Sequence, residues 1–116
     1  MIYTAQYRYQ GKDRLDITVK GNCIAGKLYA PNWTMVNGIK KGTISEDEYT
    51  KLYYELLIKK WSTNSDEILK LVNLIKDRDI TLVCFCPANN FCHRYLLVNF
   101  LKHNWNVQYG GERKLT

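Results

Sequence analysis

The chain has 116 residues, of which 46% are hydrophobic and 24% are charged, and it carries a formal net charge of +6. This length predicts a single domain over residues 1–116, and the composition excludes bulk disorder. No apolar run reaches the length of a membrane span, and the positive charge favours an anionic partner such as a nucleotide, a phosphate or a nucleic acid.

The cysteines and the N-terminus indicate the compartment. The chain begins Met-Ile-Tyr-Thr-Ala, without the charged and apolar regions of a signal peptide. Two of the four cysteines, Cys84 and Cys86, lie on one expected strand, where they are poorly placed to bridge each other. We therefore expect a reduced, cytoplasmic protein.

The first third of the chain predicts two strands and a loop. Residues 2–9 and residues 15–20 favour extended structure, the second through its alternation of apolar and polar side chains, and residues 10–13 form a turn. We expect these two strands to form a hairpin or to lie as neighbours. Residues 21–32 hold two glycines, so they predict a loop with at most one short extended piece.

Capping signals then predict helices. Pro31 or Asn32 can begin a short helix, which Gly42 ends. Ser45 and Glu48 form a capping box, and the helix that follows carries an apolar stripe at intervals of three and four residues. We expect this helix to end near residues 60–61.

The remaining elements alternate in type. Asn64 repeats the capping signal, so a further helix is expected to end near residues 77–78. Residues 80–85 are apolar on both faces and predict a buried central strand. A last helix over residues 91–103 and a short strand over residues 104–109 precede the tail. This alternation predicts a three-layer α/β fold.

The junction between the buried strand and the last helix is the predicted site. The first turn of that helix carries Cys92, His93 and Arg94, where free backbone amides and the helix dipole favour an anion. Arg94 adds a charge with bidentate geometry, and Asn89 and Asn90 add amide hydrogen bonds. The sequence therefore predicts an anion-binding cradle.

Cys92 is the candidate nucleophile, with His93 as the acid–base group, because a thiol at a helix N-terminus beside Arg and His ionises readily. The alternative is a small residue that packs under the loop. A cysteine-dependent phosphatase is disfavoured, because the sixth residue after Cys86 is Cys92 and not Arg. A metal site is not expected, because Cys84, Cys86, Cys92 and His93 lack the paired spacing of zinc ligands.

Further candidate ligand-binding residues lie outside this junction. The basic candidates could approach the site across the sheet, and the alternative for them is a solvated surface. The aromatic candidates could stack on a ring of the ligand, and the alternative is ordinary core packing. The two candidates near the C-terminus could close over a ligand, and the alternative is a frayed terminus. These candidates are Arg8 and Arg14, Tyr7, Trp33 and Tyr53, and Glu112 and Arg113.

Several segments over nearly the whole chain carry a family resemblance. They are Tyr-Arg-Tyr at 7–9, Asp-Arg-Leu-Asp-Ile-Thr-Val-Lys at 13–20, Tyr-Ala-Pro at 29–31, Gly-Thr-Ile-Ser-Glu-Asp-Glu-Tyr-Thr at 42–50, Leu-Val-Cys-Phe-Cys at 82–86, Phe-Cys-His-Arg at 91–94 and Gly-Glu-Arg at 111–113. Together they resemble the "domain of unknown function 488" family, most closely its short members from bacteria and bacteriophages. The element Phe-Cys-His-Arg is the most specific of them.

The resemblance implies a single Rossmann-like three-layer domain with a small, mostly parallel central sheet flanked by helices. It also implies a cytoplasmic location, in the host cytoplasm if the chain is phage-encoded. Cys92, His93 and Arg94 correspond to the signature site of the family. The resemblance carries no reaction over to this chain.

These observations lead to one expected function and two alternatives. We expect the chain to bind a small anionic nucleotide-type ligand, including molecules derived from NAD or ADP-ribose, at residues 86–94 and without a cofactor. A phage-encoded domain of this kind could sequester a host immune nucleotide signal. The alternatives are a cysteine-dependent enzyme acting on nucleotide or glycosyl substrates and a nucleic-acid-binding module.

Overall fold

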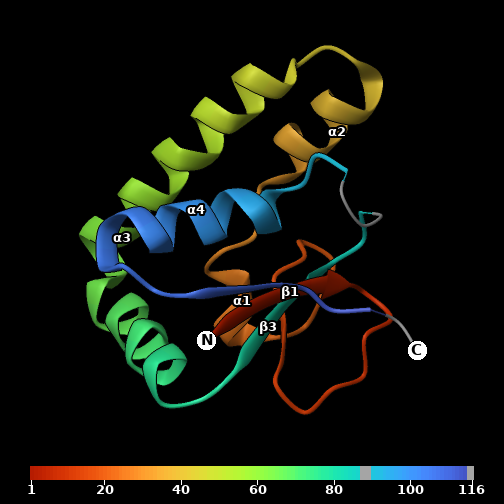
Figure 1. The fold of residues 1–116 in the computed structure, drawn as a ribbon. Helices are drawn as coiled ribbons and strands as arrows, with labels where there is room; N and C mark the ends of the chain where they lie inside the picture. The colour runs from red at the N-terminus through yellow and green to blue at the C-terminus, as the bar shows by residue number, and fades with distance from the viewer. Residues whose placement is uncertain (87–89, 115–116) are drawn as a thin grey trace.

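The computed structural model describes residues 1–86 and 90–114, which form a parallel sheet and its covering helices (Figure 1). The strands run parallel in the order β2-β3-β1-β4, so the chain forms a small α/β domain, as predicted. In chain order the elements are β1 (Ile2–Gln6), β2 (Arg14–Asp16), α1 (Ile24–Lys27), α2 (Trp33–Lys41), α3 (Glu46–Asp77), β3 (Ile80–Cys84), α4 (His93–Trp105) and β4 (Tyr109–Glu112).

Strand β3 is interior, as its continuous apolar run predicts. All five of its residues are buried, and it pairs with β1 on one side and β2 on the other. Both arrangements expected for the first two strands, a hairpin or adjacent strands, are wrong, because β3 lies between them and runs parallel to both. An interior strand of a parallel sheet has helices over both of its faces, which agrees with the burial of all the side chains of β3.

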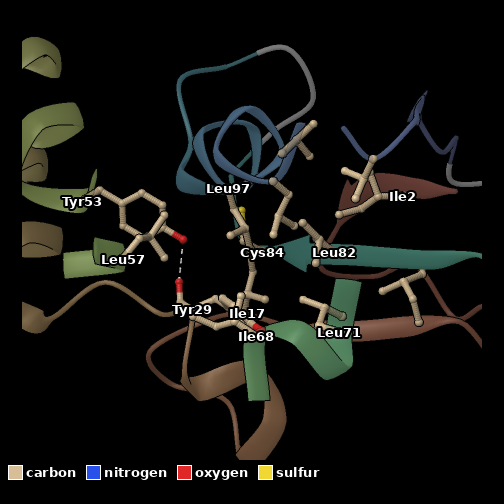
Figure 2. Close-up of a cluster of buried hydrophobic side chains, with 14 of the residues drawn as sticks. Ile2, Ile17, Tyr29, Tyr53, Leu57, Ile68, Leu71, Leu82, Cys84 and Leu97 are labelled. Carbon is tan, nitrogen blue, oxygen red and sulfur yellow. Dashed lines mark hydrogen bonds between the residues drawn. The ribbon is translucent and has the colours of Figure 1, made fainter. Parts of the chain in front are cut away.

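Helices cover both faces of the sheet. Figure 2 shows Leu97 of α4 and Leu71 of α3 on opposite sides of β3, with Tyr53 and Leu57 entering the core from the earlier part of α3. All four of these side chains are buried. Burial of apolar side chains on both faces is the main source of stability in such a layered domain.

The capping signals correctly predict where α2 and α3 begin. Asn32 accepts a hydrogen bond from the Met35 amide at 2.8 Å, and the Ser45 hydroxyl accepts one from the Glu48 amide at 3.1 Å. Gly42 ends α2 with a φ of 76°, a left-handed conformation that glycine adopts without strain. The separate helix expected from the signal at Asn64 is present as the later part of α3, because Asn64 has a non-helical backbone (φ −133°, ψ 35°) and α3 is kinked there (Figure 1).

Four elements differ from the expectation, and two of them are β1 and β2, which end earlier than expected, at Gln6 and Asp16. Residues 24–27, expected to lie in a loop, form the single helical turn α1. The last strand begins at Tyr109 and not at Asn104, because α4 continues to Trp105 and ends at Asn106 in the left-handed conformation. Among the described residues, no helix is long and apolar enough to span a membrane.

Candidate functional site

A pocket of about 270 Å³ lies where β2 and β3 end, between α2 and the first residues of α4. The carboxyl ends of parallel strands are the usual place for ligands in open α/β sheets. Five segments line the pocket: the turn after β2, α2 with the residue Pro31 before it, the first turn of α3, the end of β3 with the residues after it, and the start of α4. Its apolar walls include Trp33, Val36, Ile39, Tyr49, Phe85 and Phe91.

The charged side chains around this pocket are basic. Lys20 follows β2, Lys40 lies in the last turn of α2, and both side chains are exposed. Among the described lining residues there is no Asp or Glu. Two lysines without a nearby carboxylate in the lining give the mouth of the pocket a preference for anions.

The turn after β2 is held in place by the buried carboxylate of Asp16. This carboxylate accepts hydrogen bonds from the Thr18 amide at 2.9 Å and from the Thr18 hydroxyl at 2.6 Å. It also accepts one from the Tyr7 hydroxyl at 3.1 Å, and the Gly21 amide donates to the Thr18 hydroxyl at 3.0 Å. These bonds compensate for the burial of the charge, and they orient Thr18 and Lys20 along the pocket.

Cys92 and His93 lie side by side in the wall of the pocket, and both are buried. The His93 Nε2 atom is 2.8 Å from the carbonyl oxygen of Ile17, and because a carbonyl only accepts, Nε2 carries the proton. The lone pair of Nδ1 then faces the Cys92 sulfur at 3.7 Å. Burial, opposed by the Ile17 hydrogen bond, lowers the pKa of His93 to about 4, so the ring is neutral at pH 7.

Cys84, the last residue of β3, adds a second sulfur to this wall. The sulfur atoms of Cys84 and Cys92 are in contact, while their Cα atoms are 7.9 Å apart. Cysteines that form a disulfide have Cα atoms about 4.4–6.8 Å apart, so the backbone here is too widely spaced for a relaxed cross-link. The pair is therefore two neighbouring sulfurs beside the His93 ring. Cys23 and Cys86 are free cysteines outside the pair.

The predicted role of Arg94 as an exposed anion anchor requires correction. Its side chain is fully buried, and its guanidinium donates to the Cys84 sulfur and to the Cys86 carbonyl, both at 2.9 Å. The same group donates to the Glu112 carboxylate and to the Tyr95 hydroxyl, both at 3.0 Å. Arg94 therefore supports the site from inside, because β4 covers it and Glu112 neutralises its charge.

The predicted aromatic residues and Asn90 have different positions. Trp33 lines the pocket and is 46% exposed, which leaves its ring available to a ligand. Tyr53 is fully buried, so it cannot stack on a ligand, and its ring contacts the His93 ring edge-on. Tyr7 is not among the described lining residues, but it stacks on the wall residue Phe85 with ring centroids 4.1 Å apart. Asn90 is exposed.

Asn89 lies outside the described residues. The predicted residues of the first turn and the C-terminus do not reach the pocket. Arg8 is exposed, and Arg14 donates to the backbone carbonyls of the preceding turn. Glu112 and Arg113 do not close over a ligand, because Glu112 pairs with Arg94 and Arg113 pairs with Asp13 at 3.1 Å.

Sequence reasoning missed the two lysines at the mouth of the pocket. Lys20 is the last residue of an expected strand, and Lys40 lies near the end of an expected helix. Positions where elements end beside the carboxyl edge of a sheet are the available signal for such residues. The topology was also needed, because it brings the end of β2 next to the end of β3.

Comparison with known proteins identifies the family and leaves the ligand undefined. The family model DUF488-N3a, described as "Active DUF488-N3 subclade", matches residues 5–105. No curated protein and no solved structure matches the chain. The matched range includes the turn after β2, α2, the end of β3 and α4, so it contains all the segments that form the pocket.

Proposed function

The chain belongs to the DUF488 family, and we propose that the pocket at the ends of β2 and β3 is the binding site for a small anionic ligand of the nucleotide type. The observation that carries this proposal is the composition of the pocket, which combines aromatic walls with a basic mouth. A nucleotide-type ligand has two parts that match these features: a flat ring for the aromatic walls and an anionic phosphate group for the basic mouth.

The walls fit the ring. Trp33 from α2 and Phe91, which precedes α4, offer flat faces on which a heterocycle can stack, a contact worth about 1–3 kcal/mol per base in nucleic-acid-binding proteins. The volume of about 270 Å³ is at the lower limit for small-molecule pockets. We therefore place one ring system inside the pocket and the rest of the ligand at its mouth.

The mouth fits the phosphates. Lys20 and Lys40 come from different segments, so they can contact a diphosphate from two sides. In both ADP-ribose and NAD, a flat adenine ring is followed by two phosphates, which is the order that the pocket and its mouth would accept. In a phage-encoded chain located in the host cytoplasm, binding of this kind would withdraw a nucleotide signal from the host.

Isothermal titration calorimetry with ADP-ribose, NAD, AMP and cyclic AMP tests the proposal. We expect at least one of these to bind one molecule per chain. For that ligand, Lys20→Ala and Lys40→Ala are each expected to weaken binding by about fivefold to tenfold, which corresponds to about 1–1.4 kcal/mol. Lys51→Ala, on an exposed face of α3, is the matched control and should bind like the parent.

Two results would count against the proposal. The first is the absence of binding heat for all four compounds. The second is binding that Lys20→Ala and Lys40→Ala leave unchanged. Tight binding of duplex or single-stranded oligonucleotides, with an affinity that falls steeply with salt, would favour the nucleic-acid alternative instead.

A further inference from the structure

Three metal-ligating side chains converge at the inner end of the pocket. The sulfur atoms of Cys84 and Cys92 and a ring nitrogen of His93 all lie within 4.8 Å of one another, and all three residues are buried. They come from the end of β3 and the start of α4, and all three line the pocket. Two sulfurs and one imidazole are ligands that Zn²⁺ and similar ions prefer.

The His93 ring has the orientation that a metal ligand requires. Its Nε2–H is anchored on the Ile17 carbonyl, so Nδ1 presents its lone pair toward the two sulfurs. Metal-ligating histidines almost always donate their other ring N–H in this way, often to a backbone carbonyl. The edge-on contact between the Tyr53 and His93 rings further restricts rotation of the His93 ring.

The backbone spacing of the two cysteines allows a shared ion once their sulfurs, which are in contact in this structure, move apart. Their Cα separation of 7.9 Å is too long for a relaxed disulfide. Two thiolates on one tetrahedral ion, each bound at about 2.3 Å, hold their sulfurs roughly 3.8 Å apart and therefore tolerate a wider backbone spacing.

The surrounding charges are balanced for a divalent ion. Two thiolates neutralise the ion, and Glu112 neutralises Arg94 at 3.0 Å. Arg94 also donates a hydrogen bond to the Cys84 sulfur at 2.9 Å. A donor of this kind would stabilise the negative charge of a metal-bound thiolate and hold it in position.

We propose that Cys84, Cys92 and His93 bind one Zn²⁺-type ion, whose fourth position is open to the pocket. The two thiol protons leave to solvent when the ion binds, as they do for other thiolate sites. Three protein ligands and one open position are typical of zinc sites that bind a substrate or water directly. The open position would contact the nucleotide-type ligand proposed above, although binding of the ion does not depend on that ligand.

Metal titration of the whole chain tests this site without any assay of activity. The protein is purified with a chelator, reduced, and titrated with Co²⁺, which reports thiolate and imidazole ligands in tetrahedral geometry through its visible spectrum. We expect saturation at one Co²⁺ per chain, loss of the spectrum when Zn²⁺ displaces it, and a rise in the unfolding temperature with added Zn²⁺.

Two of the four cysteines are proposed ligands, and the other two provide matched controls. Cys84→Ser, Cys92→Ser and His93→Ala are each expected to weaken metal binding at least 100-fold, whereas Cys23→Ser and Cys86→Ser should bind like the parent. Circular dichroism identifies any variant that fails to fold. If His93→Ala fails to fold, His93→Gln is used in its place, and if Cys92→Ser fails to fold, Cys92→Ala is used.

Several outcomes would overturn the metal site. These are the absence of a Co²⁺ spectrum in the reduced parent, equal loss of binding in Cys86→Ser, and unchanged binding in folded Cys84→Ser and Cys92→Ser. Rapid alkylation of Cys92 by iodoacetamide in a reduced protein that binds no metal would also overturn it, and would favour the cysteine-dependent enzyme.

Discussion

Arg94 and Glu112 form an ion pair inside the protein that joins α4 to β4. The Arg94 side chain is fully buried, while the Glu112 side chain is 16% exposed. The Tyr95 hydroxyl donates to the same carboxylate at 3.0 Å, so Glu112 satisfies two neighbouring donors of α4. A buried pair of this kind need not stabilise the fold relative to apolar residues, but removal of one partner leaves the other charge in an unfavourable environment.

At the residue scale we therefore predict that Glu112→Ala lowers the free energy of unfolding by about 3–5 kcal/mol, because it leaves the buried Arg94 charge without its carboxylate. Urea denaturation measures this change. Glu55→Ala, at an exposed position of α3, is the control and should change stability by less than about 0.5 kcal/mol. A loss below 1 kcal/mol for Glu112→Ala would show that water reaches the guanidinium.

At the element scale, the single turn α1 packs directly on the end of β2. Gly26 is buried in this turn, and a Cβ atom built there would collide with the backbone carbonyl of Asp16. The absence of a side chain at Gly26 therefore permits the close approach of α1 to the strand. This approach also places α1 against the backbone of Asp16, the residue whose carboxylate orients the turn of the pocket.

Gly26→Ala should consequently destabilise the protein by about 1–3 kcal/mol, as expected for overpacking against a rigid backbone. Thermal unfolding measures the loss, with the exposed neighbouring substitution Ala25→Ser as a near-neutral control. Equal stability of the two variants would mean that α1 moves away from β2 at little cost.

The elements also show which parts of the fold local signals can predict. Asn32 and Ser45 predicted helix starts, and the apolar run of β3 predicted a buried strand, because capping and burial act over a few residues. The position of β2 depends on β3, which is 64 residues or more away in the chain, so no local pattern distinguished it from a hairpin. The turn α1 depends on the contact of Gly26 with Asp16, which is also absent from the local pattern.

The same distinction applies to the candidate site. Cys92 and His93 could be placed at the start of a helix from the sequence, and the structure confirms that position. Whether Arg94 points to solvent or inward depends on β4 and Glu112, which the spacing of the motif does not reveal. The grouping of Cys84 with Cys92 and His93 likewise depends on the register of β3 against α4 and not on ligand spacing in the chain.

At the scale of the whole molecule, buried tyrosines connect α3 to the rest of the core. The Tyr53 hydroxyl donates to the Tyr29 carbonyl at 2.7 Å, as the dashed line in Figure 2 shows, and Tyr49 packs against Tyr53. Burial raises the pKa of Tyr29 and of Tyr49 above the usual value near 10. The folded state therefore favours the protonated phenol more strongly than the unfolded state does.

This difference predicts a loss of stability in alkali. A phenol whose pKa is raised by folding contributes fully below pH ~10, and its contribution falls as the pH rises from there toward the folded-state value. Tyr29→Phe keeps the ring and removes the ionisable group, so we expect its alkaline unfolding midpoint to be higher than that of the parent. Fluorescence-monitored titration of both proteins measures it, and identical midpoints would show that Tyr29 does not titrate on unfolding.

The central claim is that the pocket at the ends of β2 and β3 binds a nucleotide-type anion. Titration of ¹⁵N-labelled protein with ADP-ribose, followed by NMR, tests it most directly, because each amide and the Trp33 indole report separately. The account predicts saturable shifts at Val19, Lys20 and the Trp33 indole, all in the pocket lining, while residues such as Lys12 and Lys70 beside the outer edge of β2 stay unchanged. Shifts confined to that outer edge, or no shifts with ADP-ribose, NAD and AMP at saturating concentration, would contradict it.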